Sequence, residues 1–152
     1  MAQKVKVIAE NRKVRHEYEL FDRYEAGLEL RGTEIKSIRL GKVQLKDSFV
    51  SFHDNEAFIK GMHISPYEFG NRFNHDEVRE RKLLLKRSEI LKLGNAVRVK
   101  GYTVVPVKVY LNHGLAKLEI ALAKGKNLHD KRESEKARDA KREIEKALKN
   151  RY

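Results

Sequence analysis

The fold class is decided by the stretch Thr103-Val104-Val105-Pro106-Val107-Lys108-Val109-Tyr110-Leu111, which continues through Asn112-His113-Gly114 into residues 115–122. β-Branched residues dominate the first arm. In the second arm Leu118, Ile120 and Leu122 share one face and alternate with other residues. Two such arms around a short Asn- and Gly-containing turn predict a β-hairpin. Pro106 cannot donate a hydrogen bond to a neighbouring strand, so we expect it at a sheet edge or a bulge.

Shorter segments repeat this strand pattern toward the N-terminus. Val5 and Val7 alternate with lysines, Tyr18 and Leu20 alternate with acids, and residues 28–30 continue the pattern. A second hairpin is predicted over residues 49–52 and 57–59, which a polar connection joins. We therefore predict a mainly β protein, an OB-fold-like closed barrel of about six strands with two or three short helices and a flexible C-terminal tail. The choice of the OB fold among small barrels rests on analogy.

Two short helices are predicted between the strands. The first runs from an N-cap at Thr33 to Leu40, and the second runs from an N-cap at Ser88 to Leu93, where Gly94 ends it. The segment 65–76 is predicted to be a long polar loop. A loop of this length is more often functional than a simple connector. Its aromatic residues are Tyr67, Phe69 and Phe73.

The composition changes at Lys124, so we predict a barrel domain over residues 1–123 and a basic tail over 124–152. The tail carries 11 Lys and Arg against 6 Asp and Glu, a net +5. A thin apolar stripe and several i,i+3 charge pairs favour a helix, but each pair contributes only about a few tenths of a kcal/mol. An isolated helix of this size is marginal in water. We therefore expect the tail to be disordered alone and helical against a partner.

The charge balance points to a polyanionic partner. The chain has 34 Lys and Arg against 22 Asp and Glu, a net +12. Such an excess repels itself in the folded protein and favours nucleic acid, because phosphate contacts release counterions.

Several function classes are disfavoured by the sequence. No apolar run is long enough for a membrane span, and the first residues lack the apolar core of a signal peptide, so we expect a cytoplasmic protein without a membrane partner. There are no cysteines, and the six histidines lack metal-ligand spacing. No nucleotide-binding or catalytic motif is present. We expect no enzyme activity, no metal, no cofactor and no small-molecule substrate.

Three basic segments are candidates for RNA contact, and each also has a plain explanation. Residues 32–42 place Lys36 and Arg39 on one face of a short helix, which is also compatible with a solvated surface. Glu34 could accept hydrogen bonds from base amino groups. Residues 79–87 surround a leucine triplet with five cations; the leucines suit a core, and the cations suit a partner or solvent equally. Residues 124–132 read as a charged linker or as a segment that enters an RNA channel, with His129 stacking on a base.

Seven stretches, in order and at similar spacing, resemble the small protein B family, the SsrA-binding proteins of bacterial trans-translation. They are Asn11-Arg12-Lys13 with Arg15-His16-Glu17-Tyr18, Glu25-Ala26-Gly27-Leu28, Gly32-Thr33-Glu34-Ile35-Lys36-Ser37, His63-Ile64-Ser65-Pro66-Tyr67, Arg81-Lys82-Leu83-Leu84-Leu85, Gly101-Tyr102-Thr103-Val104-Val105-Pro106, and Gly125-Lys126 with Asp130-Lys131-Arg132. The resemblance spans nearly the whole chain.

The resemblance implies an OB-fold protein without catalytic activity. It would bind the transfer-RNA-like domain of transfer-messenger RNA (tmRNA, or SsrA RNA) and deliver it to stalled ribosomes, where its barrel stands in for the missing anticodon half of a transfer RNA. The tail would enter the empty messenger path at the decoding centre of the small subunit and fold there as a helix.

The resemblance also implies two sets of functional residues. RNA contacts would fall on Asn11, His16, Tyr18, Glu34, Lys36, Arg39, Lys42, Arg81, Lys82, Leu84 and Lys124. The decoding-centre segment of the tail would be Gly125, Lys126, His129, Asp130, Lys131 and Arg132. Two alternatives stay open: a generic single-stranded nucleic-acid binder on the same barrel, and a structural protein of the ribosome. A nuclease is a third and less favoured alternative.

Overall fold

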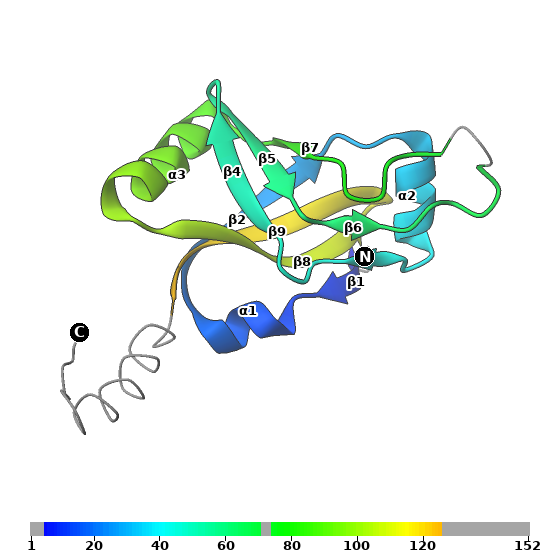
Figure 1. The fold of residues 1–152 in the computed structure, drawn as a ribbon, viewed down its shortest axis with the longest axis horizontal. Coiled ribbons are helices and arrows are strands. Elements are labelled where there is room, and N and C mark those ends of the chain that lie inside the picture. The colour runs from blue at the N-terminus through cyan, green and yellow to red at the C-terminus, as the bar shows by residue number, and fades with distance from the viewer. Residues whose placement is uncertain (1–4, 71–73, 126–152) are drawn as a thin grey trace, which may run out of the picture.

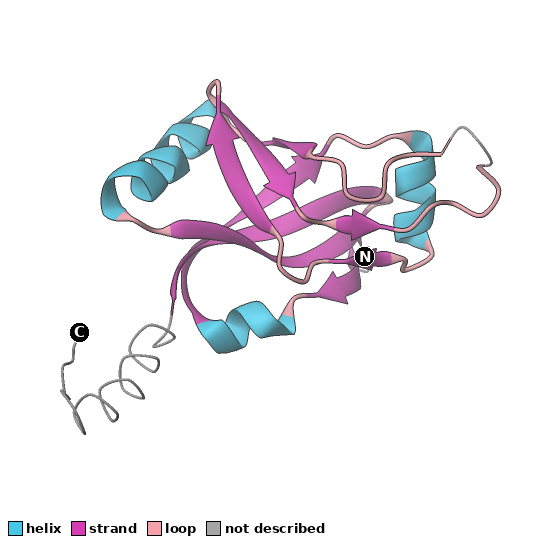
Figure 2. Ribbon diagram, in the orientation of Figure 1, coloured by secondary structure: helices cyan, strands magenta, loops and turns pink. Residues whose placement is uncertain are grey.

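Strands dominate residues 5–70 and 74–125, the part of the chain that the computed structural model describes. The mainly β prediction is confirmed (Figures 1 and 2). The strands of this part are β1 (Val5–Glu10), β2 (Tyr18–Leu28), β3 (Val43–Gln44), β4 (Phe49–His53), β5 (Glu56–Lys60), β6 (His63–Ile64), β7 (Arg81–Leu84), β8 (Thr103–Asn112) and β9 (Leu115–Gly125). Its helices are α1 (Arg12–Glu17), α2 (Gly32–Arg39) and α3 (Arg87–Lys100).

The hairpin predicted near the C-terminal end of the body is present and consists of β8 and β9. β8 and β9 pair from Thr103 and Ala123 to Asn112 and Leu115, and the turn residues His113 and Gly114 have φ of 53° and 83°. Positive φ at both central residues is the geometry of a type I′ turn, one of the two favoured two-residue hairpin turns. The strand order is β1-β8-β4-β5-β7-β2-β9, and β9 also pairs with β8, so the pairings that leave β8 through β4 return to β8 through β9. β3 and β6 form a separate pair.

One edge of β8 is shared by two strands, and Pro106 lies where they change over. β1 pairs with Lys108–Asn112, whereas β4 pairs with β8 at Val104. On the other edge of β8, the register of its pairing with β9 shifts between Pro106 and Lys108. Such a β-bulge is a position where proline is expected. Asn11 fills the changeover: its backbone N–H donates to the Val107 carbonyl at 2.8 Å, and its Nδ2 donates to the Pro106 carbonyl at 3.1 Å. The ladder is thus interrupted without leaving these carbonyls unpaired.

The core lies on the face of β9 that the sequence predicts. Leu118 and Ile120 have no exposed surface. The other face of the hairpin is also covered, because α1 places Val14 against Val105 and Ala123 in a second, smaller apolar cluster. Helix α1 was not predicted: it has only six residues, and its N-cap is Asn11, whose Oδ1 accepts the Val14 N–H.

The predicted end of the second helix at Gly94 is wrong. Helix α3 has 14 residues, passes through Gly94 and ends before Gly101, which has φ of 73°. Gly94 is buried against Phe52, so packing outweighs the weak helix propensity of glycine. The N-cap is Lys86 and not Ser88, and the Glu89 carboxylate accepts the Lys86 N–H at 2.9 Å. No helix of the described part is long and apolar enough to cross a membrane.

Other boundaries also differ from the prediction. Helix α2 begins after an N-cap at Arg31 and not at Thr33. β2 ends at Leu28, so Leu30 lies outside the strand. β9 continues to Gly125, where it pairs with Tyr18. The tail expected to be disordered alone was placed at residues 124–152; Lys124 and Gly125 lie in β9, and residues 126–152 lie outside the described residues.

Substituting two glycines tests the extent of α3. A Cβ on Gly94 would lie 3.8 Å from the Phe52 ring, an ordinary contact, whereas Gly101 has left-handed backbone. Gly94→Ala is expected to raise the free energy of unfolding by about 0.5–1 kcal/mol, and Gly101→Ala to lower it by about 1–2 kcal/mol. Urea unfolding measures both. A loss of stability in Gly94→Ala would show that the helix ends at Gly94.

Candidate nucleic-acid interface

Helix α2 separates its charges by face. Lys36 and Arg39 are exposed, and Lys42 is exposed just beyond the helix, while Ser37 and Ile38 are buried. Figure 1 shows α2 at one end of the molecule and α3 at the other. The three cations predicted to contact RNA are therefore available together at the α2 end.

Glu34 lies on the inner face of α2 and is completely buried. Its Oε1 accepts the Arg31 backbone N–H at 2.7 Å and Nη2–H of Arg79 at 2.8 Å. Its Oε2 accepts Nε–H of Arg79 at 2.8 Å and Nε–H of Arg81 at 2.7 Å. Each carboxylate oxygen thus holds two donors, and Arg79 is bound in a bidentate fork.

Arg81 extends this cluster into the loop between β6 and β7. The guanidinium is fully buried; its Nη1 donates to the Met62 carbonyl at 2.7 Å, and its Nη2 donates to the carbonyls of Asp76 and Glu77 at 3.2 and 3.1 Å. Glu34 and Arg81 therefore connect α2, β7 and the loop. A buried pair with all its hydrogen bonds made is costly to break, because one charge would remain without a partner.

The direct RNA contacts expected of Glu34, Arg81 and Asn11 do not fit their positions. Each is buried, and their polar groups already bond to the protein. The Glu34 carboxylate in particular has no exposed surface, and its readout of a base stays a prediction that its burial does not favour. These residues fix the geometry of the surface, and the exposed cations nearby remain the candidates for contact.

The environment of Glu34 favours its ionised form. Burial alone would raise its pKa, but hydrogen bonds from Arg79, from the Arg31 backbone and from Arg81 outweigh it, and the pKa lies below its ordinary value of 4.5. The carboxylate is therefore charged throughout the neutral range.

β7 divides its predicted residues by the alternation of a strand. Arg81 and Leu83 point inward and are buried, whereas Lys82 and Leu84 face outward. Lys82 Nζ lies 3.0 Å from Oε2 of Glu56, and that hydrogen bond raises the pKa of Lys82. Leu84 is 51% exposed. Of this group, Leu84 is the side chain that is free of a polar partner and open to a ligand.

A groove joins Leu84 to Arg39. It encloses about 280 Å³, and its apolar walls come from β2, α2 and the β8–β9 turn. Lys117 stands at its side together with Arg39, so the groove is apolar inside and cationic at its border. Its lining residues are Gly27, Leu28, Leu30, Ile35, Arg39, Leu84, Gly114, Leu115, Ala116 and Lys117. We call it the α2 groove.

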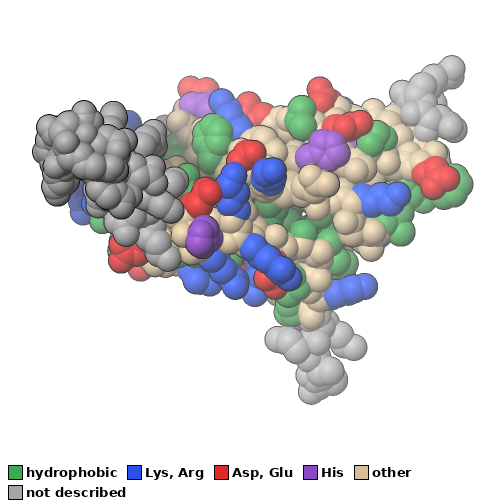
Figure 3. Space-filling view, turned by 60° about the horizontal axis from the view of Figure 1, so that its bottom comes forward, with side chains coloured by type: hydrophobic (Ala, Val, Ile, Leu, Met, Phe, Trp, Pro, Cys, Tyr) green, Lys and Arg blue, Asp and Glu red, His purple; other side chains and the backbone are tan. Residues whose placement is uncertain are grey.

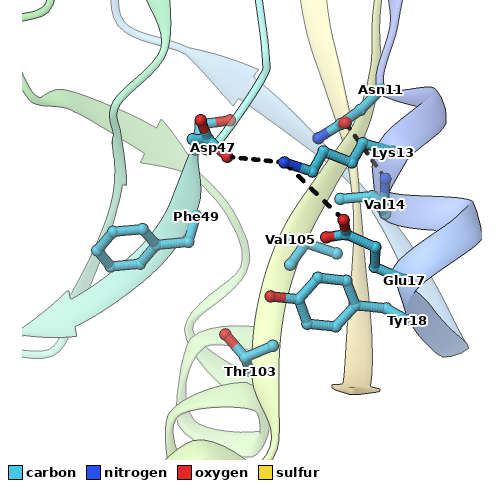
Figure 4. Close-up of a pocket in the computed structure, with 10 residues that line it drawn as sticks. Asn11, Lys13, Val14, Glu17, Tyr18, Asp47, Phe49, Thr103 and Val105 are labelled. Atoms are coloured by element: carbon cyan, nitrogen blue, oxygen red, sulfur yellow. Dashed lines mark hydrogen bonds and ion pairs between the residues drawn. The ribbon is translucent and has the colours of Figure 1, made fainter. Parts of the chain in front are cut away.

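A second cavity contains Asn11 and Tyr18. It lies between α1, β4 and β8 and encloses about 280 Å³. Figure 4 shows the Tyr18 and Phe49 rings on facing walls, with Lys13 reaching between two carboxylates. Lys13 Nζ lies 3.6 Å from Asp47 and 3.8 Å from Glu17. We call it the α1 pocket; its carboxylates suit amino-group donors better than phosphates.

The remaining predicted residues lie toward the α1 side. His16 is exposed in the last turn of α1. Lys124 is exposed near the end of β9, with Nζ 5.0 Å from the centre of the Tyr102 ring. Gly125 pairs with Tyr18. Lys126, His129, Asp130, Lys131 and Arg132 lie outside the described residues. The described RNA-contact candidates thus fall into an α2 group and an α1 group.

Charge is interspersed and does not form one continuous patch on the face drawn in Figure 3, where Lys and Arg alternate with acidic and hydrophobic side chains.

Arg79 was missed as a site residue because the sequence does not reveal its partner. The alternation Arg79, Arg81, Leu83 could have indicated that these residues share an inward face.

Comparison with known proteins assigns the family. The family model described as "SmpB protein" matches residues 8–150. The chain belongs to the SmpB family. Curated relatives are similarly close: the SsrA-binding protein of Carboxydothermus hydrogenoformans is 56% identical over 97% of this chain and 99% of its own. That of Caldanaerobacter subterraneus subsp. tengcongensis is 58% identical over 97% and 93%.

A solved SmpB structure is similar in fold. A chain from the work "tmRNA-SmpB: a journey to the center of the bacterial ribosome" aligns with a TM-score of 0.67 and 47% sequence identity. The alignment covers 79% of this chain and 85% of that one. The resemblance inferred from the sequence is therefore confirmed at the level of family and fold.

Replacing Glu34 by glutamine tests the buried cluster. Because Arg81 would lose its charged partner, Glu34→Gln is expected to lower the free energy of unfolding at pH 7 by about 3–5 kcal/mol. The native pKa of Glu34 is depressed, so this stabilisation is complete above the ordinary value of 4.5 that the unfolded chain has and is lost as the pH falls through the native value.

Urea unfolding between pH 2 and 7 measures the effect. The difference between wild type and Glu34→Gln should shrink at the acid end, while the exposed control Glu29→Gln should remain near wild type throughout. A constant difference across this range would mean that the ionisation of Glu34 does not contribute.

Proposed function

We propose that this chain binds the transfer-RNA-like domain of tmRNA and delivers it to stalled ribosomes for peptide tagging. The observation that carries the proposal is its near-full-length similarity to SsrA-binding proteins, joined to an exposed cationic end around α2. Acting on the ribosome places this activity in the cytoplasm. No catalytic step is assigned to the chain.

The α2 end suits a folded RNA. Lys36, Arg39 and Lys42 supply phosphate contacts, which set affinity without reading sequence. The α2 groove offers Leu84 and an apolar floor to one unpaired nucleotide. Structured RNA is recognised mainly by shape and by its unstacked bases. The buried Glu34–Arg81 pair keeps these exposed groups in a fixed arrangement.

The body acts in this proposal as an OB-fold-like closed barrel. The return of the strand pairings to β8 supports this interpretation. The barrel takes the place of the anticodon half that a transfer RNA would have, and residues 124–152 form the part that acts on the ribosome. His16, Tyr18 and Lys124 contact RNA on the α1 side, next to the start of the tail.

The tail in this proposal probes the empty messenger channel at the decoding centre and becomes helical there. Gly125, Lys126, His129, Asp130, Lys131 and Arg132 are the residues assigned to that contact. A charged segment with a thin apolar stripe gains enough order only when a partner supplies a surface. The tail therefore couples RNA delivery to the presence of a stalled ribosome.

Neutralising the α2 cations should weaken RNA binding in a salt-dependent way. Arg39→Gln is expected to reduce affinity for the transfer-RNA-like domain and to lower the slope of log K against log salt by about 0.9 per lost phosphate contact. Fluorescence anisotropy at several salt concentrations measures this. The control is Lys92→Gln at the opposite, α3 end, which should leave the slope unchanged. Equal effects of both variants would place the phosphate contacts elsewhere.

Deleting residues 128–152 should separate RNA binding from tagging. The truncated protein is expected to bind the transfer-RNA-like domain nearly as tightly as the full chain, because the α2 cations and Lys124 remain. Tagging on stalled ribosomes in a reconstituted translation system should be lost. A tail of scrambled sequence keeps the charge and should also fail. If either variant supports tagging, the tail segment does not have the assigned role.

A further inference from the structure

The loop between β6 and β7 holds two aromatic rings at the surface beside α2, outside the set of predicted contact residues. Phe69 is 71% exposed, the most exposed large apolar side chain in the described part. Its ring meets Tyr67 edge-on, with centroids 5.6 Å apart and planes at 70°. The Phe69 ring thus contributes little to the core.

The backbone that carries these rings is held in place. Tyr67 N–H donates to Oδ1 of Asn74 at 2.8 Å, and Nδ2 of Asn74 donates to the Tyr67 carbonyl at 2.6 Å. A further bond from the Gly70 N–H to the Tyr67 carbonyl, at 2.9 Å, closes a turn around Phe69. Gly70 itself is confined, because a Cβ there would lie 2.6 Å from Nδ2 of Asn74.

The loop is also fixed to α2. His75 is buried, and its Nε2 lies 2.9 Å from the Ile64 carbonyl, which can only accept, so Nε2 carries the hydrogen. Its Nδ1 then accepts the Thr33 hydroxyl at 2.8 Å. This bond explains why Thr33 does not cap the helix. Together with Arg81, it keeps the loop at the α2 end, as Figure 1 shows.

Cations stand next to the rings. Lys36 Nζ lies 5.5 Å from the centre of the Tyr67 ring, within the range of a cation–π contact. The Ser65 N–H donates to the Lys42 carbonyl at 3.1 Å, which places Lys42 at the base of the loop. Glu68 lies between the two aromatic residues in sequence, so we assign phosphate contact to the lysines and not to the loop itself.

We infer that Phe69, supported by Tyr67, is a stacking platform for one unpaired nucleobase of a folded RNA whose adjoining phosphate meets Lys36 or Lys42. An exposed aromatic ring on a fixed backbone beside cations is the arrangement that binds an unstacked base. The inference rests on the proposed RNA binding. It adds a base contact at Phe69, in the loop between β6 and β7, to the contact assigned to the α2 groove.

Substitution of Phe69 tests the inference. With in vitro transcribed transfer-RNA-like domain as the probe, Phe69→Ala is expected to bind about 5- to 150-fold more weakly, the loss typical of one stacked base. The salt slope should remain unchanged, because no phosphate contact is lost. Phe69→Trp should bind within about threefold of wild type. Val99→Ala, which truncates an apolar side chain on α3 that is 68% exposed, is the control and should bind as wild type. The thermal unfolding midpoint of Phe69→Ala should not change.

A second measurement identifies the base. Each unpaired nucleotide of the probe is replaced in turn by an abasic one. At one position, the abasic nucleotide should weaken binding to the wild-type protein. The same abasic RNA should bind the Phe69→Ala variant no more weakly than the unmodified RNA does. Wild-type binding by Phe69→Ala, or no abasic position that couples to Phe69, would overturn the inference.

If the wild type itself does not prefer this RNA over a random-sequence RNA of equal length, the proposed function fails instead. Loss of tagging with unchanged RNA binding in Phe69→Ala would assign the rings to a ribosomal contact and would also overturn the inference.

Discussion

The arrangement of the α2 end depends on one buried carboxylate. Glu34 accepts four hydrogen bonds, from Arg31, Arg79 and Arg81, and so joins the start of a helix to a strand and its preceding loop. Charges without solvent are stable only when each has its partners, so this joint has essentially one geometry. The exposed cations of α2 and the rings of the loop take their relative positions from it. Glu34, an acidic residue in a basic protein, thus fixes the position of the helix that carries the exposed cations.

A second constraint comes from the divided edge of β8. A proline interrupts the ladder where β1 gives way to β4, and Asn11 supplies the donors that the carbonyls there would lack. The same residue caps α1, which covers the second face of the hairpin. One asparagine therefore bonds to the β8 carbonyls at the bulge, caps a helix and lines the α1 pocket. The side-chain amide of Asn11 is already hydrogen-bonded to the protein and has few bonds left for RNA. A residue that matches a family motif can therefore have a structural role.

The sequence predicted the strands best, because a half-buried strand repeats every two residues and its turns carry Gly or Asn. Both hairpins and the inward face of β9 followed from that pattern, and the missing N–H of Pro106 predicted an edge or a bulge there. It failed where a distant partner decides the local structure. Gly94 is tolerated within α3 because it packs on Phe52, and Thr33 leaves the helix cap because His75 accepts its hydroxyl. The same limit applied to the site: the sequence marks Glu34, Arg81 and Asn11, but only the fold places them inside.

The 34 Lys and Arg of the chain overstate the number of cations that are free to meet RNA. Arg79 and Arg81 are engaged by Glu34, Lys82 by Glu56, and Lys13 by Glu17 and Asp47. A lysine or arginine that already faces a carboxylate has less charge to offer a phosphate, so we expect phosphate contacts from exposed cations without such a partner, among them Lys36, Arg39 and Lys42. In the proposed RNA interface, selectivity comes from the apolar and aromatic groups that the buried network holds beside those cations. In this proposal, affinity and selectivity come from different side chains of the same short helix and its neighbouring loop. The buried Glu34–Arg81 pair holds these two sets of side chains at fixed positions relative to each other.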